Sequence, residues 1–298
     1  MKYYVAVDIG GTSIKFGIIN EKGKAVFSSK TNTEANKGGN HLVQKIIQII
    51  TPLIQSNKSN IKISGIGVST AGVVDSKIGN IVYANNNLPC YSGTNWKKIL
   101  WEHFHLPISV CNDVHAASLA EAWVGAGRGY QNFLCITIGT GIGGGAFING
   151  RQFTGSHQRA LALGYMNTAG NNRIYERKAS TATLVHRIEL LTGDRGINGK
   201  NVFIEAKSGD TVYSHILENW VDELAKGLAN AIFCFDPELI IIGGGVSKEG
   251  QPLITHICNS LKKYVPAPFL SEISLRPAEC GDFSGIIGAV YNLVKIKK

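Results

Sequence analysis

The chain has 298 residues, of which 44% are hydrophobic and 17% charged, a composition typical of an ordinary soluble globular protein and not of a disordered one. No apolar run approaches the roughly 20 residues that cross a bilayer, so no membrane segment is expected, and six widely separated cysteines without a Cys-x-x-Cys pair indicate buried free thiols and a cytoplasmic protein. The formal charge of +9 comes from dispersed lysines without interleaved aromatic residues, so direct nucleic-acid binding is not expected and a nucleotide or phosphorylated small molecule is a sufficient anionic partner.

The first part of the chain reads as a meander of three strands followed by alternating helix and strand. The spacing of β-branched and apolar residues predicts strands at 3–9, 13–20 and 24–31, a helix at 41–54, a strand at 61–69, a helix at about 94–103 and a strand at 107–111. A chain of this length exceeds the usual single core. Two α/β domains are therefore expected, 1–113 with a C-terminal helix at about 283–298, and 114–282.

The second part repeats this order of elements. Its predicted elements are a helix at 114–124, strands at 132–139 and 143–149, a short strand around 163–165, helices at 180–192 and 210–235, a strand at 238–242, a helix to about 264, a strand at 272–276 and a helix from 283. Both parts carry a glycine-rich turn near their start. The two halves are therefore expected to be structurally similar.

Two glycine turns follow apolar strands more than a hundred residues apart, at Asp8-Ile-Gly-Gly-Thr12 and at Thr137 to Gly145. Glycine lets backbone N–H groups approach an anion closely, so the turns predict a clamp for the phosphates of ATP. A carboxylate at Asp8 fits such a site if Mg²⁺, held through phosphate or water, neutralises the repulsion. Ordinary tight turns are the alternative. Lys15 is either a phosphate ligand or a solvated strand residue.

The first turn is neither a P-loop nor a Rossmann fingerprint, because GxxxxGK[ST] is absent and a strand follows the turn. A third glycine run, Gly243-Gly244-Gly245, follows the apolar residues 240–242. These glycines offer a flat backbone surface to adenine and ribose, and a close junction between strand and helix is the alternative.

Asn112-Asp113 comes directly after a buried strand, and ligands in α/β sheets bind beyond the carboxyl ends of strands. Asp113 is therefore a candidate general base that takes the proton of a substrate hydroxyl as that oxygen attacks phosphorus. The alternative is that Asp113 only caps the helix at 114–124.

Together these motifs resemble the ROK family (repressor, open reading frame, kinase) of the sugar kinase, Hsp70 and actin superfamily. The resemblance rests on Asp8 to Thr12 with Lys15, Gly65 to Gly72 with Val74-Asp75, Asn87-Leu88-Pro89, Asn112-Asp113, 137–145 and 235–245. It implies a two-domain α/β fold of the actin-like, ribonuclease H-like type with a cleft between the domains. A homodimer is expected.

The turns and the resemblance together define the expected site. The ATP-binding candidates are Asp8, Gly10, Gly11, Thr12, Lys15, Thr137, Gly139, Thr140, Gly141, Gly143, Gly243, Gly244 and Gly245. Asp8 is also the candidate residue for Mg²⁺, held through phosphate or water. Asp113 is the expected catalytic base. The sugar-binding candidates are Asn87, Asn112, Asp113, Tyr165 and Glu176.

Residues 162–176, which correspond to the family's sugar-binding segment, depart from the family pattern; this segment is the sugar half of the expected site. The family commonly has Glu-x-Gly-His followed by a zinc motif of one histidine and three cysteines, whereas this chain reads Ala162-Leu-Gly-Tyr165 and has no cysteine between Tyr165 and Glu176. No zinc site is therefore expected, and packing must hold the loop. Tyr165 and the missing zinc motif resemble the β-glucoside kinases, although those enzymes keep the glutamate that is Ala162 here.

The expected activity is ATP- and Mg²⁺-dependent phosphorylation of a sugar, best matched by the 6-hydroxyl of the non-reducing glucose in a β-glucoside such as cellobiose. Glucose or an N-acetylhexosamine such as N-acetylmannosamine is the alternative substrate. Ala162 also leaves open a sugar-sensing regulatory protein with weak or no kinase activity. Nothing in the chain suggests a cytoskeletal or chaperone ATPase.

Overall fold

The computed structural model describes residues 1–55, 61–168 and 174–295, and the chain forms two compact units. The first unit comprises Met1–Arg128, Thr154–Arg159 and Asp282–Lys298, and the second comprises Gly129–Phe153 and Ala160–Gly281. The helix that begins at Asp113 belongs to the first unit. The domain boundaries expected at residues 113 and 282 stay a prediction.

The first unit is built on a five-stranded sheet with the order β3-β2-β1-β4-β7. Its strands are β1 (Tyr3–Ile9), β2 (Ser13–Asn20), β3 (Ala25–Asn32), β4 (Ile63–Thr70) and β7 (Ile108–Asn112), and a separate hairpin consists of β5 (Val73–Asp75) and β6 (Asn80–Tyr83). Strands β1, β2 and β3 pair antiparallel, whereas β4 and β7 add in parallel. This is the meander and crossover pattern that the sequence predicts.

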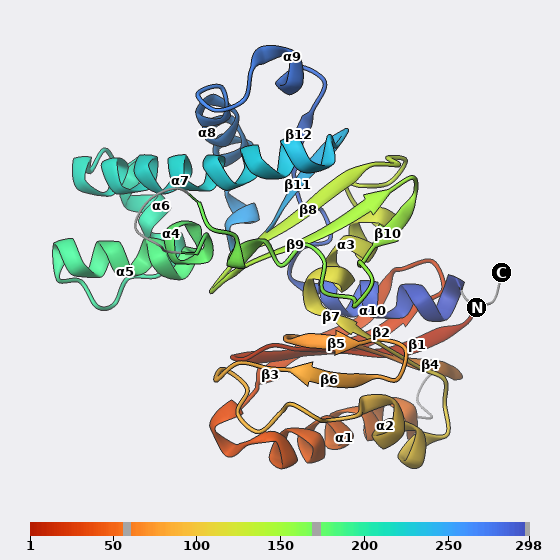
Figure 1. Cartoon of the computed structure of the whole chain (residues 1–298). Helices are drawn as coiled ribbons and strands as arrows, with labels where there is room; N and C mark the ends of the chain where they lie inside the picture. The colour runs from red at the N-terminus through yellow and green to blue at the C-terminus, as the bar shows by residue number, and fades with distance from the viewer. Residues whose placement is uncertain (56–60, 169–173, 296–298) are drawn as a thin grey trace. The chain divides into compact units, whose positions relative to one another are not determined.

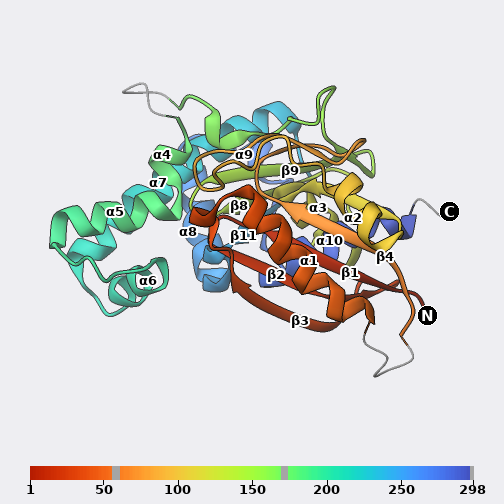
Figure 2. The same cartoon turned by 90° about the horizontal axis from the view of Figure 1, so that it is seen from below.

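Helices cover both faces of the first sheet. They are α1 (Gly39–Gln55), α2 (Trp96–Phe104), α3 (Asp113–Val124) and α10 (Ser284–Lys295). Figure 1 shows α3 and α10 on one face and α1 on the other, and Figure 2 shows α1 lying across the strands. Ile46 of α1 is fully buried with Val7 of β1 and Val68 of β4. The buried stripe of α1 explains why its sequence has helical apolar spacing.

The second unit repeats the arrangement, with a sheet of order β10-β9-β8-β11-β12. Its strands are β8 (Phe133–Ile138), β9 (Ile142–Ile148), β10 (Arg151–Phe153), β11 (Leu239–Gly244) and β12 (Ser274–Pro277). Again three antiparallel strands precede two parallel ones. The structural similarity of the two halves is therefore confirmed.

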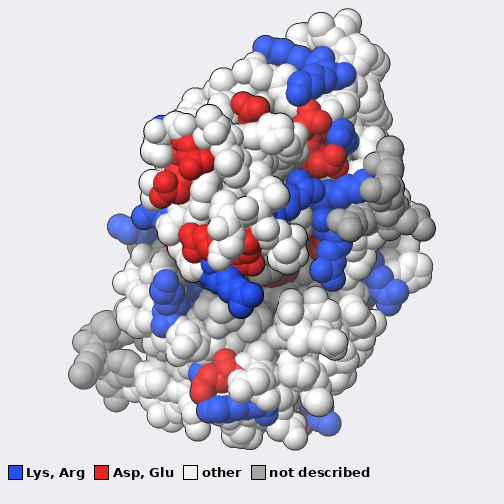
Figure 3. Space-filling view, turned by 90° about the vertical axis from the view of Figure 1, so that its left-hand side faces the viewer, with Lys and Arg blue, Asp and Glu red and all other residues white. Residues whose placement is uncertain are grey.

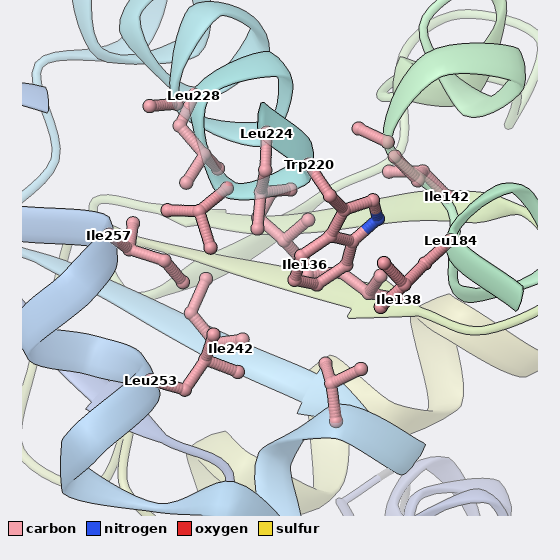
Figure 4. Close-up of a cluster of buried hydrophobic side chains, with 14 of the residues drawn as sticks. Ile136, Ile138, Ile142, Leu184, Trp220, Leu224, Leu228, Ile242, Leu253 and Ile257 are labelled. Carbon is pink, nitrogen blue, oxygen red and sulfur yellow. The ribbon is translucent and has the colours of Figure 1, made fainter. Parts of the chain in front are cut away.

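The helices of the second unit lie between β10 and β12 in the sequence. They are α4 (Glu176–Ala179), α5 (Thr181–Thr192), α6 (Gly199–Lys207), α7 (Thr211–Phe235), α8 (Gln251–Leu261) and α9 (Ala267–Leu270), with 3-10 turns η3 (Leu163–Tyr165) and η4 (Gly245–Glu249). Figure 4 shows side chains of α7 and α8 packed against β8 and β11, among them Trp220, Leu253 and Ile242. This cluster forms the core of the second unit.

Three local expectations are wrong. Residues 163–165 form the 3-10 turn η3 and not a strand, and α6 has no counterpart among the predicted helices. Cys111 and Cys135 are buried as expected, but Cys90 and Cys234 are exposed. All six cysteines are free thiols.

Over the described ranges, no helix combines the length and the apolar character needed to span a membrane. Figure 3 shows Lys and Arg in several separate groups interspersed with Asp and Glu on the face that it presents. The positive charge is dispersed there, as the sequence predicts.

Candidate active site

The first glycine turn, Gly10 to Thr12, joins β1 to β2. The N–H of Gly10 donates to the carbonyl of Ser13 at 3.1 Å. Within the described part of the chain, the N–H groups of Gly11 and Thr12 donate to no recorded acceptor. Unpaired, accessible N–H groups on a glycine turn are suited to bind an anion.

Asp8 lies near the end of β1, with a side chain that is only 14% exposed. Its Oδ1 accepts a hydrogen bond from the Ser69 hydroxyl at 2.6 Å, and its Oδ2 lies 3.7 Å from Lys15 Nζ. Burial raises the pKa of Asp8, and the positive charge of Lys15 opposes that rise. Lys15, a phosphate candidate, is thus paired with Asp8 in this structure.

The carboxylate of Asp8 also depends on a glycine in α10. A Cβ built on Gly285 would lie 2.4 to 2.7 Å from the carboxylate atoms of Asp8. Real Cβ atoms do not approach that closely, so Gly285 provides the space that the carboxylate fills.

Asn112 and Asp113 mark the junction of β7 and α3. Asn112 is the N-cap, because its Oδ1 accepts hydrogen bonds from the N–H groups of Val114 and His115. Its Nδ2 donates to Gly72 O at 2.9 Å and to Asp113 Oδ1 at 2.8 Å. The capping alternative for Asp113 is therefore wrong, since Asn112 is the cap and also orients Asp113.

The pKa of Asp113 suits a general base that works near neutral pH. Burial raises the pKa of Asp113 to about 7, with a further contribution from the negative charge of Asp8. Its Oδ1 accepts hydrogen bonds from Asn112 and from the N–H of Val114, which oppose the rise. A general base is most effective when its pKa lies near the working pH.

Asn87 lies on the loop between β6 and α2 and contacts the first turn. A Cβ on Gly11 would lie 3.1 Å from Asn87 Cβ and 3.3 Å from its carbonyl oxygen. Buried polar groups lie at the end of this loop: Trp96 Nε1 donates to Tyr91 Oη at 2.6 Å, and that hydroxyl lies 2.7 Å from Thr70 Oγ1. The loop that carries Asn87 is thereby attached to the end of β4.

In the second unit, three of the candidate ATP residues are neighbours on adjacent strands. Thr137 of β8 pairs with Gly143 of β9 on one side and with Gly243 of β11 on the other. Gly244 has a φ of +83°, and a Cβ there would lie 2.2 Å from the carbonyl oxygen of Ile138. Only glycine fits at that position, and Gly245 then begins η4.

The second glycine turn, Gly139 to Gly141, joins β8 to β9, with Thr140 exposed at its centre. The carbonyl of Gly139 accepts hydrogen bonds from the N–H groups of Thr181 and Ala182, the first residues of α5, at 2.9 and 3.4 Å. These N–H groups have no partner inside the helix. The start of α5 thus holds this turn.

Glu176, the first residue of α4, packs against two glycines. A Cβ on Gly141 would lie 2.6 Å from Glu176 Oε2, and one on Gly164 would lie 2.7 Å from the same atom. The structure therefore brings this sugar-site candidate onto the second turn. Tyr165, the other candidate of this unit, is 60% exposed on η3, next to the exposed Ala162.

The segment before Glu176 is anchored by a buried tyrosine. Tyr175 is fully buried, and its hydroxyl donates to the carbonyl of Leu224 in α7 at 2.7 Å. A Cβ on Gly227 would lie 2.2 to 2.6 Å from the Tyr175 ring. Lys178 Nζ donates to the carbonyl of Thr168 at 2.7 Å. These contacts support the expectation that packing holds the loop, although residues 169–173 lie outside the described part.

The sequence analysis missed Ser69, Gly164 and Gly285, which contact the candidate residues directly. Ser69 lies inside the motif Gly65 to Gly72, so its place at a strand end was a usable signal. Gly164 occupies the glycine of the family's Glu-x-Gly-His pattern, which was also a usable signal, whereas Gly285 carries no local signal because its importance comes from Asp8, a side chain distant in the sequence. No group of three or more His, Cys, Asp and Glu side chains suited to a metal is found among the described residues.

Comparison with known proteins places this geometry in a family. The ROK family matches residues 4–296. The β-glucoside kinase of Listeria innocua is 31% identical over 298 residues, which cover 97% of each chain. Two solved structures are also similar. One is a proposed N-acetylmannosamine kinase from Listeria monocytogenes, with a TM-score of 0.86, 29% identity and coverage of 99% of this chain and 100% of that chain. The other is a ROK family glucokinase from Streptomyces griseus in complex with glucose and AMPPNP, with a TM-score of 0.85, 27% identity and coverage of 99% of both chains.

These similarities confirm the α/β fold of the actin-like type that the sequence predicts, with the repeated sheet order described above. The family match spans nearly the whole chain, and a relative above 30% identity covers almost all of it. The chain belongs to the ROK family.

Proposed function

We propose that the protein is an ATP-dependent sugar kinase that phosphorylates the 6-hydroxyl of the non-reducing glucose of a β-glucoside such as cellobiose, with Asp113 as the general base. The observation that carries the proposal is the state of Asp113: a carboxyl oriented by Asn112, with its pKa raised to about 7 by burial and by Asp8. Such a group accepts the proton of a sugar hydroxyl near neutral pH. The kinase names of the relatives agree with this reaction.

The residues of the two glycine turns bind the phosphates. In each turn, backbone N–H groups are offered to the phosphate oxygens and stabilise the charge of the transferring phosphoryl group. Asp8 suits Mg²⁺ held through water or phosphate, because its carboxylate is only 14% exposed and the residue lies near the end of β1, two positions before the first turn. When bound, Mg²⁺ neutralises phosphate charge.

The second unit contains a cavity of about 210 Å³ that could accommodate the adenine ring. The cavity is lined by residues of α6, α7 and α8 and by Glu249, the last residue of η4, which begins at Gly245. This cavity is the proposed adenine site, and η4 connects its lining residue Glu249 to the glycines 243–245. The variant Ala206→Phe, which fills the lining, should raise KM for ATP and leave KM for the sugar unchanged.

The β-glucoside preference rests on two features of the sugar half. The small Ala162 and the exposed Tyr165 replace the family's glutamate and histidine, which leaves room for a second sugar ring. The β-glucoside kinase of Listeria innocua is also among the relatives. Glucose and N-acetylmannosamine remain the competing substrates, because a glucokinase and a proposed N-acetylmannosamine kinase are similar in structure.

The test is a substrate panel of cellobiose, gentiobiose, glucose and N-acetylmannosamine with coupled detection of ADP. The highest kcat/KM is expected for a β-linked disaccharide. If a monosaccharide turns over and cellobiose is inert, the β-glucoside assignment is wrong.

Asp113→Asn tests the reaction itself. Loss of a general base lowers kcat by about 10²- to 10⁴-fold, whereas Asp194→Asn, which changes an exposed carboxylate after α5, should leave kcat unchanged. If no sugar is phosphorylated faster by the wild type than by Asp113→Asn, the protein is not a kinase for these sugars. Binding of a sugar without turnover would then favour a sugar-sensing protein.

A further inference from the structure

We propose that Thr33 is a positioning residue that keeps the first glycine turn open for the phosphates of the nucleotide. This inference rests on the proposed function, since it assumes that ATP phosphates bind to the turn. Thr33 follows β3 and is separated from Gly10 by 23 residues in the sequence. None of the motifs of the sequence analysis includes it.

Thr33 makes two hydrogen bonds to the turn. Its hydroxyl donates to the carbonyl of Gly10 at 2.6 Å, and its backbone N–H donates to the carbonyl of Thr12 at 2.9 Å. The side chain is fully buried. Thr33 therefore fixes both ends of the three-residue turn, because the carbonyls of Gly10 and Thr12 both accept hydrogen bonds from it.

The hydroxyl of Thr33 replaces a bond that would close the turn. In a tight hairpin, the two residues that flank the turn commonly exchange both N–H to carbonyl bonds. Here Gly10 N–H donates to Ser13 O, but in the described part of the chain Ser13 N–H does not donate back to Gly10 O. Gly10 O accepts from Thr33 instead. The first carbonyl of the turn is thereby held toward Thr33, while the N–H groups of Gly11 and Thr12 at the centre of the turn make no hydrogen bond among the described residues.

The second turn shows the same device with a different donor. Gly139 occupies the place of Gly10, directly after the strand, and its carbonyl accepts from the N–H groups of Thr181 and Ala182. A donor from outside the turn thus holds the first carbonyl in both units. In the first unit that donor is a single side chain, so one substitution can remove it.

The segment that carries Thr33 is itself held firmly. Glu34 has a left-handed backbone conformation, with a φ of 56°, which is unfavourable for a residue with a side chain. Its carboxylate pairs with Lys37 and Lys45. Strained residues persist where surrounding contacts fix them. The backbone next to Thr33 is therefore held in place by the contacts of Glu34.

The experiment compares Thr33→Val, which keeps the shape and removes the hydroxyl, with Thr33→Ser, which keeps the hydroxyl. Thr51→Val is the matched control, because the Thr51 hydroxyl donates to the carbonyl of Ile47 within α1, away from the turn. Calorimetry gives the Kd for AMPPNP with Mg²⁺ and for adenosine, and thermal unfolding gives Tm. Thr33→Val should raise the Kd for AMPPNP by about three- to tenfold, as expected for one lost hydrogen bond.

The affinity for adenosine should not change in Thr33→Val, because adenosine has no phosphate. Thr33→Ser and Thr51→Val should bind AMPPNP as the wild type does. The inference is overturned if Thr33→Val binds AMPPNP normally, if it loses adenosine affinity equally, or if Thr33→Ser is as weak as Thr33→Val. These measurements need no sugar, so they decide the role of Thr33 even if the substrate panel contradicts the sugar-kinase proposal.

Discussion

Gly11 lies directly against Asn87, so that a Cβ on the glycine would come within 3.1 Å of Asn87 Cβ. One residue belongs to the expected phosphate turn and the other to the expected sugar loop. The second unit has a corresponding contact, between Gly141 and Glu176 Oε2. In each unit, a glycine of the turn therefore packs against a residue expected to hold the sugar, and a methyl group on that glycine would have to displace this residue.

Gly11→Ala should impair the sugar half of the site as well as the nucleotide half. The added methyl group must displace the backbone of Asn87, because its carbonyl oxygen is also only 3.3 Å away. We expect KM for the sugar to rise and kcat/KM to fall by about tenfold, equivalent to ~1.4 kcal/mol of transition-state stabilisation. Steady-state kinetics with each substrate varied in turn would measure this. An unchanged KM for the sugar would contradict the coupling.

Gly141→Ala and Gly139→Ala form a matched pair within the second turn. A Cβ on Gly141 meets the Glu176 carboxylate, whereas a Cβ on Gly139 meets nothing within 4 Å. Gly141→Ala should therefore lower Tm and raise KM for the sugar, while Gly139→Ala keeps both near the wild type. Equal sugar KM values in the two variants would show that Glu176 does not depend on Gly141.

The activity should depend on pH through Asp113. Because its pKa lies at about 7, the carboxyl is increasingly protonated below that pH and cannot accept a proton. The value of kcat/KM should fall by about tenfold for each pH unit below about 6.5, as for one essential base. A profile that stays flat between pH 5.5 and 7.5 would contradict the assignment of Asp113 as the base.

The raised pKa of Asp113 also makes the stability of the fold depend on pH, in the direction opposite to that of the activity. The folded state holds the Asp113 proton more tightly than the unfolded chain, whose ordinary pKa is 3.8. The resulting stabilisation is present below about pH 4 and is lost as the pH rises through about 7, up to about 4 kcal/mol. Asp113→Asn should therefore have a higher Tm than the wild type at pH 8, and the difference should shrink toward pH 4.

The turns and the order of most elements along the chain could be predicted because their signals are local. Gly10 and Gly11 lie between two runs of β-branched residues, and Asp113 follows a buried strand, so short windows of sequence define the elements. The repeat of a glycine turn between two strands, followed by helices and strands, also follows from the order of these windows, whereas β10, the third antiparallel strand of the second unit, was not predicted. Most of the ATP-binding candidates consequently lie at or near strand ends, whereas the sugar-binding candidates Asn87, Tyr165 and Glu176 lie on a loop, on η3 and on α4.

The contacts that shape the site could not be predicted because they join distant positions. Thr33 reaches Gly10 across 23 residues, and Gly285 makes room for Asp8 from the opposite end of the chain. Residues 163–165 form a 3-10 turn because Gly164 lies against Ile142 O and Glu176, a tertiary constraint with no periodic signal. The short helix α6 is similar, since buried Val202 and Phe203 stabilise it through packing.

Tyr175 should act as the anchor of the segment before Glu176. Tyr175→Phe removes the hydrogen bond to Leu224 O and should destabilise the protein by about 1 kcal/mol. Gly227→Ala, which places a methyl group on the Tyr175 ring, should lower Tm further and raise KM for the sugar. Because Gly→Ala raises helix propensity, a lower Tm in Gly227→Ala must come from the contact with the Tyr175 ring. If Tyr175→Phe and Gly227→Ala both keep the wild-type Tm and sugar KM, Tyr175 is not the anchor.

Substrate choice should follow Ala162 and Tyr165. The double variant Ala162→Glu with Tyr165→His restores the family's Glu-x-Gly-His pattern and adds two groups able to hydrogen-bond a monosaccharide. At about 1 kcal/mol for each bond, the ratio of kcat/KM for glucose to that for cellobiose should rise about tenfold or more. Ala267→Glu, on the exposed start of α9, is the control for an added carboxylate. Because both substituted side chains are exposed, the variant should fold normally, so an unchanged ratio would mean that these two positions do not determine specificity.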